Sequence, residues 1–282
     1  MTDLMPKPGI VDLDELVAER IEHPCFLSSK LEVGGYEVPT ADKPRQILAM
    51  LLTEAGKCVP VTSLSRELWG DNPPPSATTT IQTYILNLRR LLGDVKRKPH
   101  LQVLHTVPGG YSLRITDPIL VDVLGFMGTV RRLRLEGTET AEELRALIAV
   151  LENTFSLIRG PVLHDIERGP VLQNWLVTFN ENYRRAKCLW TRAALKLRWY
   201  GEVISDLLPY HLDSPYDEDF VRWLMLALYC SNREAEALDL YRRLRTVKVR
   251  DLGLEPSLLT RDLHVRILRE DREVLKNTHI FV

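Results

Sequence analysis

The sequence has no apolar run near the roughly 20 residues that a membrane-spanning helix needs. Its first residues are acidic and lack the uninterrupted apolar core of a signal peptide. The four cysteines are far apart and form no C-x-x-C pair, and the histidines do not cluster near them at ligand spacing. We therefore expect a folded cytoplasmic protein with reduced thiols, no bound metal and no contact with a membrane.

Motifs that carry enzymatic chemistry are also missing from the sequence. It has no glycine-rich GKS or GKT loop for ATP and no nucleophile elbow, and nothing brings Ser, His and Asp together. We therefore expect no catalytic residues, no cofactor and no enzymatic activity.

The chain as a whole has almost no excess of charge of either sign, because its formal net charge is −1. The charges are nevertheless unevenly distributed. Residues 1–25 carry two basic and six acidic side chains, whereas residues 26–116 carry eleven basic and seven acidic ones. The excess of positive charge therefore lies in one segment, as binding to phosphate requires.

The segments that precede and open this basic region predict a short helix and a hairpin. The run VDLDELVAERI, residues 11–21, places its apolar residues near one face of a short amphipathic helix. The runs FLSSKLEV and YEVP then flank Gly34-Gly35. Because both glycines tolerate positive φ, they predict a tight hairpin.

Three helical patterns and a second hairpin follow. The helices are expected at about 43–55, 63–69 and 77–92. Each is followed by a glycine that can end a helix in the left-handed conformation: Gly56, Gly70 and Gly93. A candidate N-cap, Ser76, precedes the third helix. Two strand-like runs, QVLHTV and YSLRI, are joined by Pro108-Gly109-Gly110, and the whole order is that of a winged helix-turn-helix domain.

The third helix decides the function predicted for this segment. At 100° per residue, one face is an apolar stripe of Ile81, Ile85, Leu88 and Leu92. The opposite face carries Thr79, Thr83, Leu86, Asn87 and Arg90, with Gln82 and Arg89 on its flank. In the major groove, Asn or Gln pairs with adenine, Arg pairs with guanine, and a Leu or Thr methyl contacts thymine. Periodicity alone favours an ordinary surface helix, but the surrounding helices and wing reverse that preference.

The second hairpin supplies candidate contacts to the DNA backbone. Gly109 and Gly110 allow the chain to approach a phosphate or the minor groove closely. Further candidate phosphate contacts are Lys43, Arg45, Arg89, Thr106 and Tyr111. For any one of these residues taken alone, a solvated surface position is an equally good interpretation.

From about residue 120 onward, helical periodicity dominates. The run YDEDFVRWLMLALYCSNREAEALDLYRRLR predicts two antiparallel helices with a turn at Ser231-Asn232. The spacing of Ala237, Tyr241 and Leu244 and the closing Pro256 are typical of a tetratricopeptide unit, and a weaker unit covers about 183–215. The expected fold class is thus mixed. An α+β winged helix-turn-helix domain is followed by an all-α tetratricopeptide-like helical domain.

The two halves together resemble a known family. The runs KPRQILAMLL, LSRELWGDNPPPSA, TIQTYILNLRRLLG and VPGGYSL resemble the OmpR-type winged-helix domain of the Streptomyces antibiotic regulatory protein (SARP) family. The runs FMGTVRRLRLEG, LIRGPVLHDI, WLMLALYCSNREAEALDLYRRLR and LGLEPSLLTRDLHVRIL resemble the bacterial transcriptional activation domain (BTAD) that follows it there. The resemblance implies a transcriptional activator that binds double-stranded DNA at direct repeats, as a homodimer, near promoters of secondary-metabolite (antibiotic) gene clusters. It also implies recruitment of RNA polymerase holoenzyme and association with the nucleoid.

The resemblance also implies that Thr79, Tyr84, Asn87, Arg89, Thr106 and Tyr111 face DNA. Leu86 and Asn87 stand where many relatives carry basic or small polar residues, so a base preference is not transferred. The complete set of predicted DNA-binding residues is Lys43, Arg45, Thr79, Thr80, Gln82, Thr83, Tyr84, Asn87, Arg89, Arg90, Thr106, Gly109, Gly110 and Tyr111.

The predicted domains follow from these segments. They are an acidic N-terminal extension (1–25), the winged helix-turn-helix domain (26–116), the BTAD (117–275) and a C-terminal tail (276–282). Two alternatives stay open at this point. One is a helical tetratricopeptide-like scaffold that binds peptides, which leaves the basic segment unexplained. The other is a repressor that uses the same DNA-binding domain.

Overall fold

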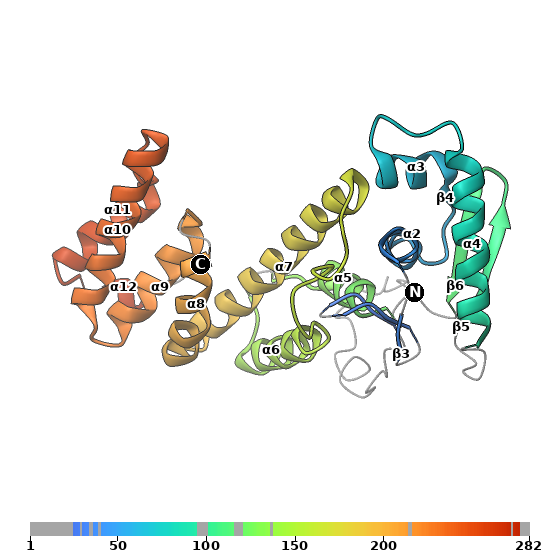
Figure 1. The fold of residues 1–282 in the computed structure, drawn as a ribbon. Coiled ribbons are helices and arrows are strands. Elements are labelled where there is room, and N and C mark those ends of the chain that lie inside the picture. The colour runs from blue at the N-terminus through green and yellow to red at the C-terminus, as the bar shows by residue number, and fades with distance from the viewer. Residues whose placement is uncertain are drawn as a thin grey trace, which may run out of the picture. The chain divides into compact units, whose positions relative to one another are not determined.

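The computed structural model describes residues 25–28, 30–33, 36–38, 41–94, 101–115, 121–135, 138–213, 216–271 and 273–276. The predicted leader helix at 11–21 lies outside these residues. The chain forms two compact units (Figure 1). The first unit is Met1–Leu133 with Ala149–Arg185, and the second is Arg134–Ile148 with Ala186–Val282. Within the described ranges, no helix is both long and apolar enough to span a bilayer.

The first unit opens with a small antiparallel sheet of three two-residue strands. These are β1 (Cys25–Phe26), β2 (Glu32–Val33) and β3 (Tyr36–Glu37), in that order. Val33 pairs with Tyr36, which is the register that a two-residue hairpin turn requires. The predicted hairpin is therefore confirmed, although the two turn glycines lie outside the described residues.

Three helices follow where the apolar periodicity predicts them. They are α2 (Asp42–Thr53), α3 (Val61–Trp69) and α4 (Ala77–Asp94). Gly70 is the C-cap of α3, with a φ of +62° but a ψ of −131° that lies outside the left-handed helical region. Gly56 has a φ of +82° and lies three residues after α2, which ends earlier than predicted with Glu54 as its C-cap. The prediction that Gly93 ends the third helix is wrong, because α4 continues to Asp94. A glycine inside a helix costs only about 1 kcal/mol, and α4 is supported by its contact with strand β5.

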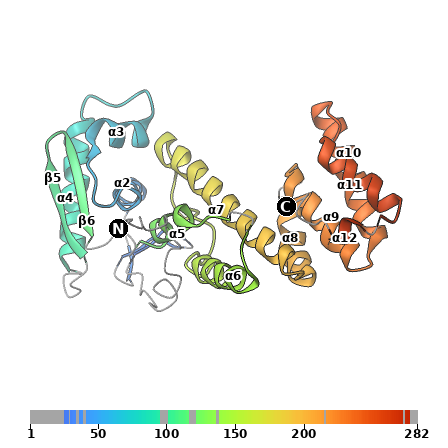
Figure 2. The ribbon, with the colours of Figure 1, turned by 180° about the vertical axis from the view of Figure 1, so that it is seen from behind.

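The wing is a three-stranded antiparallel sheet. Strands β5 (Leu101–Val107) and β6 (Gly110–Ile115) form the predicted hairpin, and β4 (Val59–Pro60) pairs with the other edge of β6. The sequence did not predict β4, which has two residues and ends in a proline. Figure 2 shows α4 alongside the β5–β6 hairpin, and α4 contacts β5.

Side chains from α2, α3, α4 and the wing enclose one apolar core. Its most deeply buried members are Ile47, Leu48, Leu51, Leu52, Leu64, Ile81, Ile85, Leu88, Leu104 and Leu113. The apolar face of α4 packs into this core. Because packing holds that face in place, the opposite face of the helix points away from the core.

The rest of the first unit is helical. It contains α5 (Asp122–Arg132), the end of α6 (Ala141–Phe155) and the start of α7 (Pro170–Lys196). The Phe126 ring is fully buried and lies with its centroid 5.5–6.0 Å from the rings of Phe155, Phe179 and Tyr183. This aromatic cluster joins the three helices.

The second unit is built from antiparallel helices. They are α8 (Tyr200–Asp213), α9 (Glu218–Cys230), α10 (Glu234–Leu252), α11 (Leu258–Leu268) and α12 (Glu273–Lys276). The predicted turn between α9 and α10 is confirmed, with Asn232 at a φ of +56°. Ala237, Tyr241, Leu244 and Pro256 are all buried, as the tetratricopeptide pattern predicts. The mixed fold class is therefore confirmed.

One carboxylate ties α9 to α10 and α11. Glu218 accepts hydrogen bonds from the Ser257 backbone N–H and the Thr260 hydroxyl, at 2.8 and 2.9 Å, and pairs with Lys248. Burial by itself raises the pKa of Glu218, but these bonds outweigh it and lower the pKa to about 2. At neutral pH Glu218 is therefore ionised, and its contacts link α9 to α10 and to the start of α11.

Candidate nucleic-acid interface

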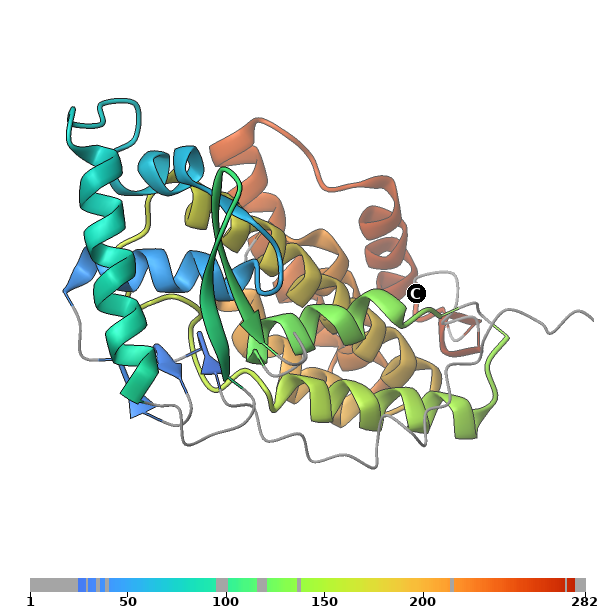
Figure 3. The same cartoon turned by 90° about the vertical axis from the view of Figure 1, so that its right-hand side faces the viewer.

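The solvent-facing side of α4 is mostly polar, with one exposed leucine. Thr79, Gln82, Thr83, Asn87 and Arg90 are exposed, and so is Leu86, at 47%. On the opposite side, Ile81, Ile85 and Leu88 are at most 1% exposed, whereas Leu92 is half-buried. The structure thus brings the six outward residues of the predicted recognition face together on one helix surface. Figure 3 looks onto the side of the first unit at which α4 and the hairpin lie next to each other.

Two further predicted residues lie at the edges of this surface. Thr80 and Tyr84 are half-buried. The Thr83 hydroxyl donates to the Thr79 carbonyl oxygen over 3.1 Å, a bond along the helix that leaves the Thr83 oxygen able to accept another. The recognition face therefore combines preformed helix geometry with side chains that remain open to solvent.

Arg89 connects the helix to the wing. Its Nε donates to the Leu104 carbonyl oxygen over 3.0 Å, and its Nη2 donates to the Thr106 hydroxyl over 2.7 Å. Arg89 and Thr106 were predicted separately as phosphate contacts, and in the structure they are bonded to each other. These bonds join α4 to β5.

The two glycines and the tyrosine of the wing differ in their exposure to solvent. Gly109 is exposed at the tip with a φ of +79°, so its backbone can approach a ligand. Gly110 is buried, and a Cβ atom there would lie 2.2 Å from the Val59 carbonyl oxygen. Tyr111 is 6% exposed. The predicted DNA contacts of Gly110 and Tyr111 are therefore not supported, because both residues are enclosed where β6 pairs with β4.

The two basic residues at the start of α2 also differ. Arg45 forms an ion pair with Asp165, and the two side chains are only 15% and 18% exposed. Asp165 also accepts the Leu31 backbone N–H over 3.1 Å. The ion pair argues against the predicted phosphate contact of Arg45, because the guanidinium already has an internal partner. Lys43 instead has its Nζ over the half-buried Trp69 ring, 4.9 Å from the ring centre, in a cation–π contact.

Hydrogen bonds that the sequence did not predict connect the residues after β1 to α5. The buried Asp122 carboxylate, at the first position of α5, accepts the backbone N–H groups of Leu27 and Ser28 at 2.9–3.1 Å and the Ser28 hydroxyl at 2.5 Å. Burial raises the pKa of Asp122, and these hydrogen bonds oppose that rise. The acceptor and its donors are more than 90 residues apart in the sequence. No local pattern could therefore have identified this link.

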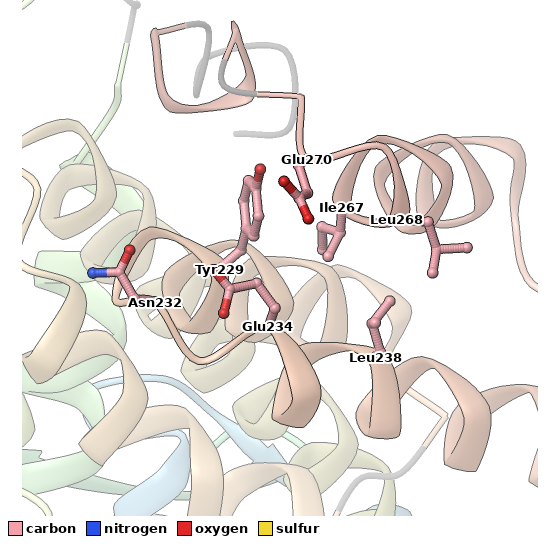
Figure 4. A pocket seen from close by; sticks show the side chains of 7 residues that line it. All are labelled: Tyr229, Asn232, Glu234, Leu238, Ile267, Leu268 and Glu270. Carbon is pink, nitrogen blue, oxygen red and sulfur yellow. The ribbon is translucent and has the colours of Figure 1, made fainter.

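A hollow of about 590 Å³ in the second unit has a different character (Figure 4). Leu238, Ile267 and Leu268 line it together with the carboxylates of Glu234 and Glu270. Acidic groups disfavour a phosphate-bearing ligand, so this hollow is not part of the candidate interface. Among the described residues, no group of three or more His, Cys, Asp or Glu side chains is placed to hold a metal ion.

Comparison with known families assigns the two halves of the chain. Residues 35–113 match the family described as "Transcriptional regulatory protein, C terminal". Residues 121–268 match the "Bacterial transcriptional activator domain". The first match contains α2, α3, α4 and nearly all of the wing, and the second begins at the residue before α5.

Individual relatives show the same arrangement. The regulatory protein DnrI of Streptomyces peucetius is 35% identical over 250 residues, which cover 86% of this chain and 90% of that protein. The transcriptional regulator RedD of Streptomyces coelicolor is 31% identical, over 94% of this chain and 74% of its own length. The solved structure of Mycobacterium tuberculosis EmbR, in complex with a low-affinity phosphopeptide, superposes with a TM-score of 0.72 at 30% identity. The match covers 87% of this chain and 64% of the EmbR chain. The chain belongs to the SARP family of transcriptional regulators.

Proposed function

We propose that the protein is a sequence-specific DNA-binding activator that inserts α4 into the major groove and recruits RNA polymerase holoenzyme. The target is a promoter with direct repeats in a secondary-metabolite gene cluster, and two copies bind there. The observation that carries the proposal is the exposed polar face of α4 beside the wing. The names of DnrI and RedD as regulators support a role in transcription.

The side chains of the α4 face match the chemistry of base edges. An Asn87 amide can donate to and accept from adenine, and the Arg90 guanidinium can donate two bonds to guanine. The exposed Leu86, which directly precedes Asn87, offers methyl groups to thymine. The face therefore holds one group for each of three bases within about one turn of helix.

Backbone contacts are proposed for residues around this face. Lys43, Thr80 and Thr106 lie on α2, α4 and β5, and α4 contacts the other two elements, so each of the three elements offers a candidate partner for a phosphate. The Gly109 backbone at the wing tip approaches the neighbouring minor groove. These contacts would set the orientation of α4, whereas Asn87 and Arg90 would select the sequence.

Base recognition is tested with Asn87→Ala on an operator found by genome-wide mapping of binding sites. We expect a loss of about 1–3 kcal/mol on that operator and little change on random DNA of equal length. Fluorescence anisotropy at fixed salt measures both affinities. Asn153→Ala, which truncates an exposed asparagine on α6, is the matched control.

Three outcomes separate the interpretations. Equal weakening on both DNAs would move Asn87 to the phosphate-contacting class. An absence of sequence preference in the wild-type protein would refute the proposed function. A runoff transcript from the operator that decreases when the protein is added would make the protein a repressor rather than an activator.

A further inference from the structure

A second buried carboxylate of the first unit lies on α3. Glu67 is 3% exposed, although glutamate is almost never buried unless it is paired. Its Oε1 accepts the backbone N–H of Gly169 over 2.7 Å. Its Oε2 accepts the N–H groups of Val171 and Leu172 over 2.8 and 3.0 Å. We call this set of three bonds the Glu67 clasp.

The clasp satisfies the first turn of α7. The first N–H groups of a helix have no acceptor within the helix, and together with the helix dipole they attract an anion. In α7 that anion is supplied by a side chain about 100 residues earlier in the sequence. Charge-assisted hydrogen bonds of this kind also offset the desolvation of the carboxylate. Glu67 is thus the N-terminal cap of α7, supplied from another helix.

The backbones of the two elements are also in direct contact. A Cβ atom at Gly169 would lie 2.0 Å from the Glu67 carbonyl oxygen, so only glycine fits there. Figure 1 and Figure 3 both show the start of α7 beside α3. The contact is therefore made by the backbone as well as by the side chain.

The helix that carries Glu67 is the one that supports α4. Leu64 and Leu68 of α3 are buried, and α3 contacts both α2 and α4. Because packed helices move as rigid bodies, a shift of α3 would also displace the recognition face. The start of α7 lies within the region that matches the activator domain, whereas α3 and α4 lie within the DNA-binding match.

We propose that Glu67 is a positioning residue for DNA recognition, which couples the α3–α4 pair to the N-terminus of α7 through the Glu67 clasp. The proposal rests on the proposed function, since it assumes that α4 binds DNA. Coupling between two sites is reciprocal. Bound DNA therefore stabilises the first turn of α7, and opening of that turn weakens DNA binding.

The test uses the full chain with Glu67→Gln, which keeps the shape but replaces one acceptor oxygen with an NH₂ group. We expect the Kd for the operator to rise about tenfold, within the range typical of coupled sites. The fraction of active protein in a stoichiometric titration and the salt dependence should not change, because Glu67 contacts no phosphate. Glu181→Gln, on an exposed glutamate of α7, should bind as the wild type does.

A second variant disturbs the clasp without removing charge. Gly169→Ala forces the backbones apart and should weaken operator binding to a similar extent. Gly128→Ala is its control, because a Cβ atom at Gly128 of α5 meets nothing within 4 Å. The double variant Glu67→Gln/Gly169→Ala should lose little more than either single variant, since both disrupt the same contact.

Hydrogen exchange measures the clasp without reference to DNA affinity. In the wild type, the amides of Gly169, Val171 and Leu172 should exchange more slowly when operator DNA is bound. In Glu67→Gln without DNA they should exchange faster. Faster exchange combined with wild-type operator affinity would overturn the positioning role. Unchanged exchange in Glu67→Gln would overturn the clasp itself, whereas failure of the wild type to select an operator would refute only the proposed function.

Discussion

At the scale of single residues, the local sequence does not reveal whether a basic side chain is available to a partner. Lys43 and Arg45 are two positions apart on α2, and both were predicted to contact phosphate. In the structure, Arg45 is paired with Asp165, 120 residues away, whereas Lys43 lies over the Trp69 ring. The two residues therefore provide a matched pair for experiment.

We predict that Lys43→Ala and Arg45→Ala have different effects. Lys43→Ala should leave the free energy of unfolding nearly unchanged and reduce the salt dependence of DNA binding by about one counterion. Arg45→Ala should lower the free energy of unfolding by about 1–3 kcal/mol, because it leaves the Asp165 carboxylate without its cation. The salt dependence should stay as in the wild type. Urea denaturation and anisotropy titrations at several salt concentrations measure the two effects.

The contrary outcome is equally specific. If Arg45→Ala reduced the salt dependence as much as Lys43→Ala does, the ion pair with Asp165 would have to open on DNA. Asp165→Asn provides an internal check, since it should destabilise the protein without removing any positive charge from the DNA-facing side.

Most of the recognition face could be predicted from residue periodicity, because one buried stripe fixes which residues of a helix point outward. The outward orientation predicted for this face is confirmed, because its residues are all exposed: Thr79, Gln82, Thr83, Leu86, Asn87 and Arg90. Residues whose placement depends on distant chain segments could not be predicted in this way. Arg45, Glu67 and Tyr111 are of this kind, since their partners are a far carboxylate, backbone N–H groups and a two-residue strand.

At the scale of elements, the wing illustrates the limit of pattern recognition. Strand β6 alternates apolar and polar residues in sequence, β5 is a longer strand-like run, and both were predicted, whereas β4 has too few residues to show a period. The third strand changes the role of Gly110, which lies against β4 instead of being exposed at the tip.

We predict that the two wing glycines respond differently to substitution. Gly109→Ala should lower the free energy of unfolding by about 1 kcal/mol, because alanine adopts a positive φ only with strain. Gly110→Ala should lower it by about 2–4 kcal/mol, because the new Cβ atom would overlap the Val59 carbonyl oxygen and separate β4 from β6. Chemical denaturation of the two variants checks the order. Equal and small effects would mean that β4 is not a stable part of the wing.

At the scale of the whole molecule, the domain boundary expected from sequence does not coincide with a compact unit. The first unit combines the winged helix with α5, the end of α6 and the start of α7. Ser28 is bonded to Asp122, and Arg45 is paired with Asp165. Glu67 accepts hydrogen bonds from the first turn of α7. A fragment of residues 26–116 would leave these buried polar groups without partners, so we expect it to be less stable than the same residues in the full chain.

Binding by two copies also belongs to this scale. One winged-helix module contacts few base pairs and buries too little surface to select a site in a genome, so a second copy is expected on the DNA. On direct repeats the two copies have the same orientation, and each α4 must enter the major groove from the same side of the duplex. The repeats should therefore be spaced by about 10–11 bp or a multiple of it.

We predict that cooperative binding depends on this helical phase. Inserting about 5 bp between the repeats turns one site to the opposite side of the duplex and should abolish cooperativity, because the two copies no longer meet. Inserting about 10 bp restores the phase and should restore part of the cooperativity, with the remainder lost to the greater distance between the copies. Footprinting across a series of spacers, with a single-repeat DNA as the control, measures the effect. If the affinity for each repeat were the same at every spacing, the two modules would bind independently and the proposed dimer on DNA would be wrong.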